Sequence, residues 1–205
     1  MRTGMVAAAI GLVIVVTGCS SSDQDAAPII VPNGPGEQAQ TISPGEASNH
    51  LPAPPNEADQ TYVTMMIVHH QQALTMTELV PSRSANETVK GLASRIADSQ
   101  KPEIGAMQQW QKQFGGGAPA HTGHDHAAMP GMASQAQLDA LAAARGGDFD
   151  RMFLQLMIAH HEGALKMATD LKSNGRNVQA EEMADDVIAV QTDEIKRMRD
   201  LLPQL

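Results

Sequence analysis

The sequence predicts an all-α protein, a four-helix bundle made of two copies of one antiparallel helical hairpin. Only 2% of the 205 residues are aromatic although 42% are hydrophobic, so aliphatic residues and 13 Met must fill the core. Strands are enriched in aromatic and β-branched residues, and such a core therefore favours helices. The two further observations are an internal repeat and long segments that end at helix-terminating residues.

The internal repeat joins two blocks of sequence at one offset of 91 residues. Residues 66–76 (MIVHHQQALTM) match residues 157–167 (MIAHHEGALKM). The pattern QxxEIxxM occurs at 100–107 and again at 191–198. Two blocks in one register are not expected by chance, so both copies are predicted to fold alike.

The first 18 residues are predicted to be a signal peptide. One Arg precedes an apolar run at 5–16, which is shorter than the roughly 20 residues that span a membrane. The small residues before Cys19, the only cysteine, resemble the lipobox of bacterial lipoproteins. Cys19 is therefore expected to carry a lipid that anchors the protein to a membrane; a buried free thiol is the alternative.

Residues 19–56 are rich in Ser, Pro and Gly and are predicted to be a flexible tether. The first hairpin, residues 57–114, should hold one helix that stops at Pro81 and another that runs from Asn86, its cap, to Phe114. The second hairpin, residues 149–205, should hold helices at 149–172 and 178–202.

The connector, residues 115–148, contains the pattern of a short helix at 135–144. An extended chain covers about 3.3 Å per residue, so the connector is long enough to cross the whole bundle. A long crossover of this kind is typical of ferritin-like bundles. A loop that stays at one end of the bundle is the alternative.

Each hairpin is expected to gather imidazole, thioether and carboxylate groups at mid-height. A turn near Ser84 would place His69 and His70 near Gln100, and Met66 near Glu103, and the repeat gives the same arrangement in the second copy. The candidate metal ligands of the bundle are Met66, His69, His70, Met76, Glu103, Met107, Met157, His160, His161, Met167, Glu194 and Met198.

Thioether with imidazole suits Cu(I), whereas imidazole with carboxylate suits Cu(II), zinc or iron. The mixture favours copper and leaves other transition metals open. Two alternatives are structural: Met fills cores in proteins with few aromatic residues, and the His pairs could form a hydrogen-bond network with Gln100 and Glu103.

The connector supplies a second set of candidate ligands. Accessory metal-binding residues within 12 positions are His121, His124, His126, Met129 and Met132. A low-complexity linker that binds divalent metals weakly is the alternative explanation.

The net charge of −9 argues against binding nucleic acid and is compatible with attracting cations. The sequence shows no nucleophile with its base and no phosphate-binding glycine loop. The Glu-x-x-His motif of di-iron bundles is replaced by Gln-x-x-Glu. We therefore expect a binding protein rather than an enzyme; a structural or interaction module and a metal-dependent oxidoreductase are the alternatives. Nothing in the sequence identifies a protein partner.

These motifs, together with GDFDRMFL at 147–154, resemble a bacterial family called domain of unknown function 305, over residues 57 to 202. The resemblance implies a ferritin-like bundle outside the cytoplasm that binds copper through His and Met and is associated with copper tolerance. The expected protein is thus a lipid-anchored, extracytoplasmic copper-binding protein that buffers or delivers Cu(I) or Cu(II).

Overall fold

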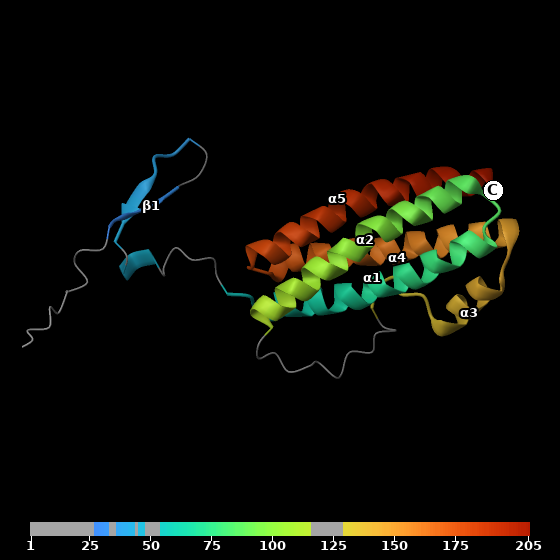
Figure 1. Ribbon diagram of the computed structural model, residues 1–205, viewed down its shortest axis with the longest axis horizontal. Coiled ribbons are helices and arrows are strands. Elements are labelled where there is room, and N and C mark those ends of the chain that lie inside the picture. The colour runs from blue at the N-terminus through green and yellow to red at the C-terminus, as the bar shows by residue number, and fades with distance from the viewer. Residues whose placement is uncertain (1–26, 33–35, 44, 48–53, 116–128) are drawn as a thin grey trace, which may run out of the picture. The chain divides into compact units, whose positions relative to one another are not determined.

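The computed structural model describes residues 27–32, 36–43, 45–47, 54–115 and 129–205. The chain divides into two compact units, Met1–Leu51 and Pro52–Leu205. The elements are β1 (Ile29–Val31), β2 (Gln40–Ile42), α1 (Glu57–Arg83), α2 (Glu87–Phe114), α3 (Gln135–Ala143), α4 (Gly146–Asn174) and α5 (Val178–Leu201), followed by a 3-10 turn (Leu202–Gln204). The second unit is a helical bundle, which confirms the predicted helical class (Figure 1).

The first unit contains a short antiparallel pair of strands, β1 and β2, with Ile29 opposite Ile42. This pair lies inside the segment predicted to be a flexible tether and is not expected from its composition. Three consecutive β-branched residues, 29–31, favour a strand locally even where the surrounding composition is that of a loop. The role of this segment as a tether stays a prediction, and the predicted signal peptide and Cys19 lie outside the described residues.

α1, α2, α3 and α5 begin at polar residues whose side chains accept backbone N–H groups of the first turn, whereas Arg145 before α4 makes no such bond. Asn56 and Asp59 form a capping box at α1, and Ser134 and Gln137 form another at α3. Asn86 caps α2 and Asn177 caps α5 in the same way. Such caps satisfy donors that have no partner inside the helix, which fixes where these four helices start.

The predicted end of α1 and the predicted start of α4 are wrong. α1 continues through Pro81 to Arg83, because a proline in the last turn removes a single backbone hydrogen bond and its ring is exposed. α4 begins at Gly146, three residues before the predicted start, and Asp148 lies in its first turn. A carboxylate there is favoured by the positive end of the helix dipole.

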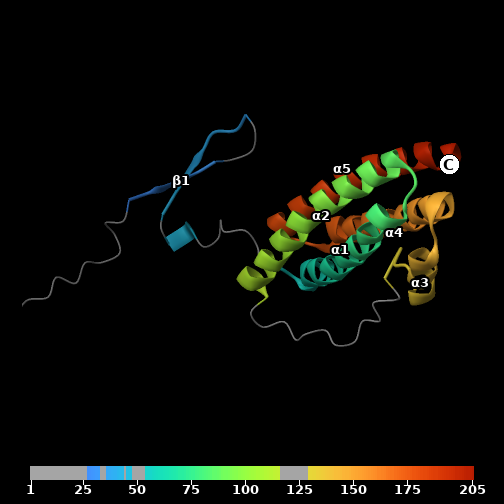
Figure 2. The same cartoon turned by 45° about the vertical axis from the view of Figure 1, so that its right-hand side comes forward.

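The long helices α1, α2, α4 and α5 lie side by side, with α1 against α2, α4 against α5, and α1 against α4 (Figures 1 and 2). α3 packs at the end of the bundle where α1 stops and α4 starts. The core is aliphatic and methionine-rich, with Phe149 and Phe153 as wholly buried aromatic residues. Within the described part of the chain, no helix is both long and apolar enough to cross a membrane.

Two buried aspartates tie each pair of helices to the loop of the other pair. Asp59 on α1 accepts the backbone N–H groups of Arg176 (3.2 Å) and Asn177 (3.3 Å) in the α4–α5 loop. Asp150 on α4 accepts the N–H of Ala85 (3.2 Å) in the α1–α2 loop. The two aspartates are 91 positions apart in the sequence, as are the two loop residues Ala85 and Arg176.

Replacing Asp59 with Asn should destabilise the protein by about 1–3 kcal/mol, because the new amide would turn a donor towards N–H groups that need an acceptor. Urea unfolding followed by the fluorescence of Trp110, the single tryptophan, measures this change. The exposed Asp139, which accepts a bond from the side chain of Gln135, is the matched control, and Asp139→Asn should change stability by less than about 0.5 kcal/mol. Equal effects of the two substitutions would contradict the proposed role of Asp59.

Candidate metal centre

Both histidines of each pair are buried, so neither of them points to a solvent-exposed flank. His69 and His70 on α1 and His160 and His161 on α4 each have 0% of their surface exposed. A buried imidazole needs hydrogen-bond partners, and the four rings obtain them in two different ways.

The second histidine of each pair binds the carboxylate of the helix that follows. The Nε2 of His70 lies 2.7 Å from Glu103 on α2, and the Nε2 of His161 lies 2.8 Å from Glu194 on α5. The sequence predicts Met66 opposite Glu103, and the structure displaces that register by about one helical turn. The loop itself lies between Ser84, the residue after α1, and Asn86, the cap of α2, where the sequence places it.

The first histidine of each pair lies at the contact between α1 and α4. The rings of His69 and His160 are 3.7 Å apart between their centres and are inclined by 34°. His160 donates its Nε2–H to the carbonyl oxygen of His69 at 2.9 Å, and His69 donates to the carbonyl oxygen of Pro130 at 3.0 Å. A carbonyl oxygen can only accept, so Nε2 carries the hydrogen in both rings and Nδ1 carries a lone pair.

Burial holds these two rings neutral. It lowers the pKa of His69 to about 3, an effect that the nearby His70 and His161 reinforce. It also lowers the pKa of His160 well below the usual range, with His69 as the next largest cause. A neutral imidazole with a free lone pair is the form that ligates metals, and a hydrogen bond from its other nitrogen fixes the ring orientation.

Several buried polar atoms have no hydrogen-bond partner among the described residues. They include the Nδ1 atoms of His69, His70, His160 and His161, and both side-chain atoms of Gln100 and of Gln191. A purely structural hydrogen-bond network would pair these atoms, so the alternative in which the histidines bond with Gln100 is not what the structure shows. The link to Glu103 is present.

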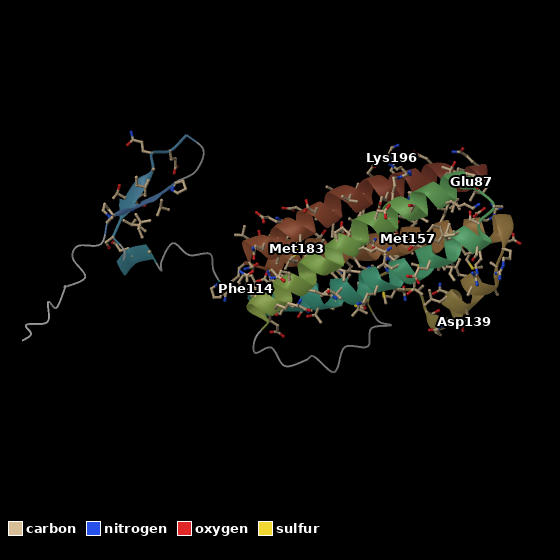
Figure 3. The ribbon with its side chains drawn as sticks, viewed as in Figure 1. Glu87, Phe114, Asp139, Met157, Met183 and Lys196 are labelled. Carbon is tan, nitrogen blue, oxygen red and sulfur yellow. The ribbon has the colours of Figure 1, made fainter. Side chains whose placement is uncertain are left out.

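The candidate methionines divide into two groups of three within the core. Met66, Met107 and Met167 belong to one buried cluster, and Met76, Met157 and Met198 belong to the other. All six are at most 7% exposed. Met157, labelled in Figure 3, is wholly buried. Each group takes two thioethers from one pair of helices and one from the other pair.

The residues present fit a soft metal ion better than a hard one. No group of three or more His, Cys, Asp or Glu side chains that could hold a metal occurs within residues 54–115 and 129–205. The buried candidate ligands are imidazole Nδ1 atoms and thioether sulfurs, ligand types that suit Cu(I) or Ag(I) rather than a hard oxygen-seeking ion.

Residues 129–133, which we call the strap, cover the contact between α1 and α4. Met129 in the strap is buried, and Gln72 bonds both backbone groups of Ala133, at 2.9 Å and 2.7 Å. Gly131 has a φ of 77°, and a side chain there would overlap the backbone of α4. A side chain at Gly163 would overlap the backbone of Pro130.

The strap accounts for the remaining predicted ligands as far as the structure describes them. Met129 is buried and Met132 is half-buried within it. The connector residues His121, His124 and His126 lie outside the described residues. The sequence patterns do not single out Gln72 and Gly163, although these two occupy equivalent positions of the repeat (HHQQA and HHEGA) where the copies differ.

The bundle thus belongs to the class of helical proteins with buried histidine and methionine side chains at a helix–helix contact. Residues 59–202 match the family described as Domain of unknown function (DUF305), and the chain belongs to this family. This confirms the resemblance found in the sequence. No curated protein sequence matches the chain.

Solved structures of this family are similar to the chain. A DUF305 fragment from Deinococcus radiodurans is 32% identical over 75% of this chain and 100% of its own, with a TM-score of 0.67. A DUF305 protein from Streptomyces coelicolor, provisionally classed as secreted, is 32% identical over 72% of this chain and 93% of its own, with a TM-score of 0.66. CopM in its Cu(I)-bound form is 35% identical over 71% of this chain and 96% of its own, with a TM-score of 0.60. CopM has also been solved with Cu(II) and with Ag bound.

The close approach of the strap to α4 can be tested with Gly163→Ala. The added methyl group would displace backbone atoms of Pro130, so we expect a loss of about 1–3 kcal/mol in unfolding free energy. Gly105→Ala on α2 is the matched control: nothing lies within 4 Å of that position, and removing a helical glycine should stabilise by about 0.5–1 kcal/mol. An unchanged unfolding free energy in Gly163→Ala would show that the strap does not pack as described.

The metal-free protein should lose stability as the pH falls from about 6.5 towards 4. In this range the unfolded chain protonates histidines whose ordinary pKa is about 6.5, while His69, with a folded pKa of about 3, and His160 stay neutral in the fold. Each of the two rings should lower the free energy of unfolding by up to about 1.4 kcal/mol for every pH unit of this fall. Urea unfolding with a chelator present measures the slope, which His160→Gln should reduce; an unchanged slope in this variant would contradict the assignment.

Proposed function

We propose that the protein binds copper outside the cytoplasm, held to a membrane by a lipid on Cys19, and that it buffers or delivers the metal in copper tolerance. The proposed bundle is a ferritin-like four-helix assembly of two equivalent hairpins, each of which supplies one His pair, one carboxylate and buried thioethers. Cu(I) is the favoured cargo of the interior. The connector residues His121, His124 and His126 would form an accessory site.

The observation that carries this proposal is the set of buried imidazole nitrogens that have no partner among the described residues. Leaving a buried polar atom unpaired costs about 1–3 kcal/mol, and four equivalent atoms in two repeated motifs make this a costly arrangement unless a ligand binds there. The hydrogen bonds to carbonyl and carboxylate oxygens orient these rings as ligating histidines are oriented.

The family members support the same conclusion independently. CopM has been solved with Cu(I), Cu(II) and Ag bound, at 34–35% identity to this chain. Ag(I) shares the preference of Cu(I) for thioether ligands, and the six buried candidate methionines of the bundle provide such ligands. The Streptomyces coelicolor protein provisionally classed as secreted supports the location outside the cytoplasm, and the acidic net charge would attract cations.

Cu(I) titration against the coloured chelator bicinchoninate tests the proposal. The variants are H69Q/H160Q and M66L/M157L in the bundle, and H121A/H124A/H126A in the connector. We expect tight binding by the parent protein and a loss of about tenfold or more in affinity for each bundle variant, as is usual when a metal site loses a supporting group. The connector variant should lose only weaker, additional ions.

Met183→Leu is the matched control, since Met183 on α5 is a half-buried methionine that packs against the edge of the Met66 cluster and is not one of the candidate ligands (Figure 3). Helical content measured by circular dichroism shows whether each variant folds. Folded bundle variants that bind Cu(I) as the parent does would reject the bundle site. Absence of tight binding by the parent would leave a structural helical protein.

A further inference from the structure

A groove opens between the first turns of α1 and the last turns of α4. Its volume is about 450 Å³. The residues of this α1–α4 groove that matter for the argument are Glu57, Tyr62, Met65, Pro130, Met167 and Asp170. The groove is therefore built from both helices that carry the His pairs, and from the strap.

The groove offers soft ligands behind an acidic mouth. Met65 is half-buried and Met167 is 7% exposed, so one thioether is near solvent and the other is deeper. The carboxylates of Glu57 and Asp170 are exposed, and Asp170 is paired with Lys166. Among the described residues the hydroxyl of Tyr62 has no hydrogen-bond partner although the side chain is only 4% exposed.

The inner wall of the groove reaches the candidate metal centre. Met167 packs in the same buried cluster as Met66 and Met107. Pro130, which also lines the groove, accepts the hydrogen bond from His69. The groove thus touches both kinds of buried ligand, thioether and imidazole, through residues that form its own lining.

The equivalent position at the other end of the bundle is covered. The repeat relates Tyr62 to Phe153 and Met65 to Leu156, and these two pack in the core cluster that α3 joins. Leu141 of α3 is wholly buried there, and Arg83 donates its Nε–H to the carbonyl oxygen of Ala142 at 2.8 Å.

The difference between the two ends lies in the side chains as well as in α3. A hydroxyl and a thioether line the open groove, where the covered end has a phenyl ring and an isobutyl group. The Tyr62 hydroxyl and the Met65 thioether therefore have no counterpart at these two positions of the covered end, although Met76 is the counterpart of Met167 there.

We propose that the α1–α4 groove is the port through which a soft monovalent cation, Cu(I) or Ag(I), reaches the interior of the bundle, with Met65 and Met167 as transient ligands. This inference rests on the proposed copper function and adds a site to it. Thioethers exchange a soft ion without releasing a proton, and the exposed Glu57 carboxylate at the mouth raises the local concentration of cations. Met65 binds the ion during its transfer and is not part of the site that stores it.

The test is the rate of Cu(I) uptake from the bicinchoninate complex, followed as the loss of its colour in stopped flow. Met65→Leu conserves volume and removes the outer thioether. We expect uptake to slow by about tenfold, in line with the loss of a group that supports metal transfer, while the final amount of bound Cu(I) stays that of the parent. Met183→Leu, a half-buried methionine outside the groove, should take up Cu(I) at the parental rate.

A second variant, Ala58→Phe, fills the groove with a ring and leaves every candidate ligand in place. It should slow uptake of both Cu(I) and Ag(I) without changing the capacity at equilibrium. Parental rates in both groove variants would overturn the port. A parent protein that takes up no Cu(I) would instead overturn the proposed function, so the two failures are distinct.

Discussion

The structure depends on the need of four buried imidazole rings for hydrogen-bond acceptors. Each ring donates from Nε2, and the acceptors come from four separate places: Glu103 on α2, Glu194 on α5, the backbone of α1 at His69, and the strap at Pro130. These bonds fix the register within each pair of helices and the contact between α1 and α4. They also leave the Nδ1 of every one of these rings without a partner in the described part of the chain, so one constraint both orders the fold and leaves four ring nitrogens unpaired.

The repeat and the composition are sufficient to predict the helical class and to identify the residues that meet in the core. His70 and Glu103 can be paired to within about one turn because a short loop forces two helices to lie antiparallel. The strap cannot be predicted in this way. Its position depends on a close backbone approach between Gly163 and Pro130. A glycine in the sequence does not by itself show which segment packs against it, so this contact could not be foreseen.

Local and global signals also conflict at two places in the chain. Pro81 is a helix terminator by its chemistry, yet the last turn of α1 tolerates it because few hydrogen bonds remain to be lost there. The β-branched residues 29–31 form a strand within a segment whose composition is that of a linker. Composition averaged over a long segment hides the strand-forming residues 29–31. The rule that a proline ends a helix, applied to Pro81 alone, overstates the effect of that residue.

The reciprocal contacts of Asp59 and Asp150 have the form of an isologous interface, in which each surface meets its own copy and every contact occurs twice. The chain is in this sense a dimer whose two subunits are covalently joined. The N–H groups of Ala85 and Arg176 in the two loops find their acceptors on the other half. Separation of the halves would therefore expose buried carboxylates and amides at both ends together, so the bundle is expected to unfold as one cooperative unit and not one hairpin at a time.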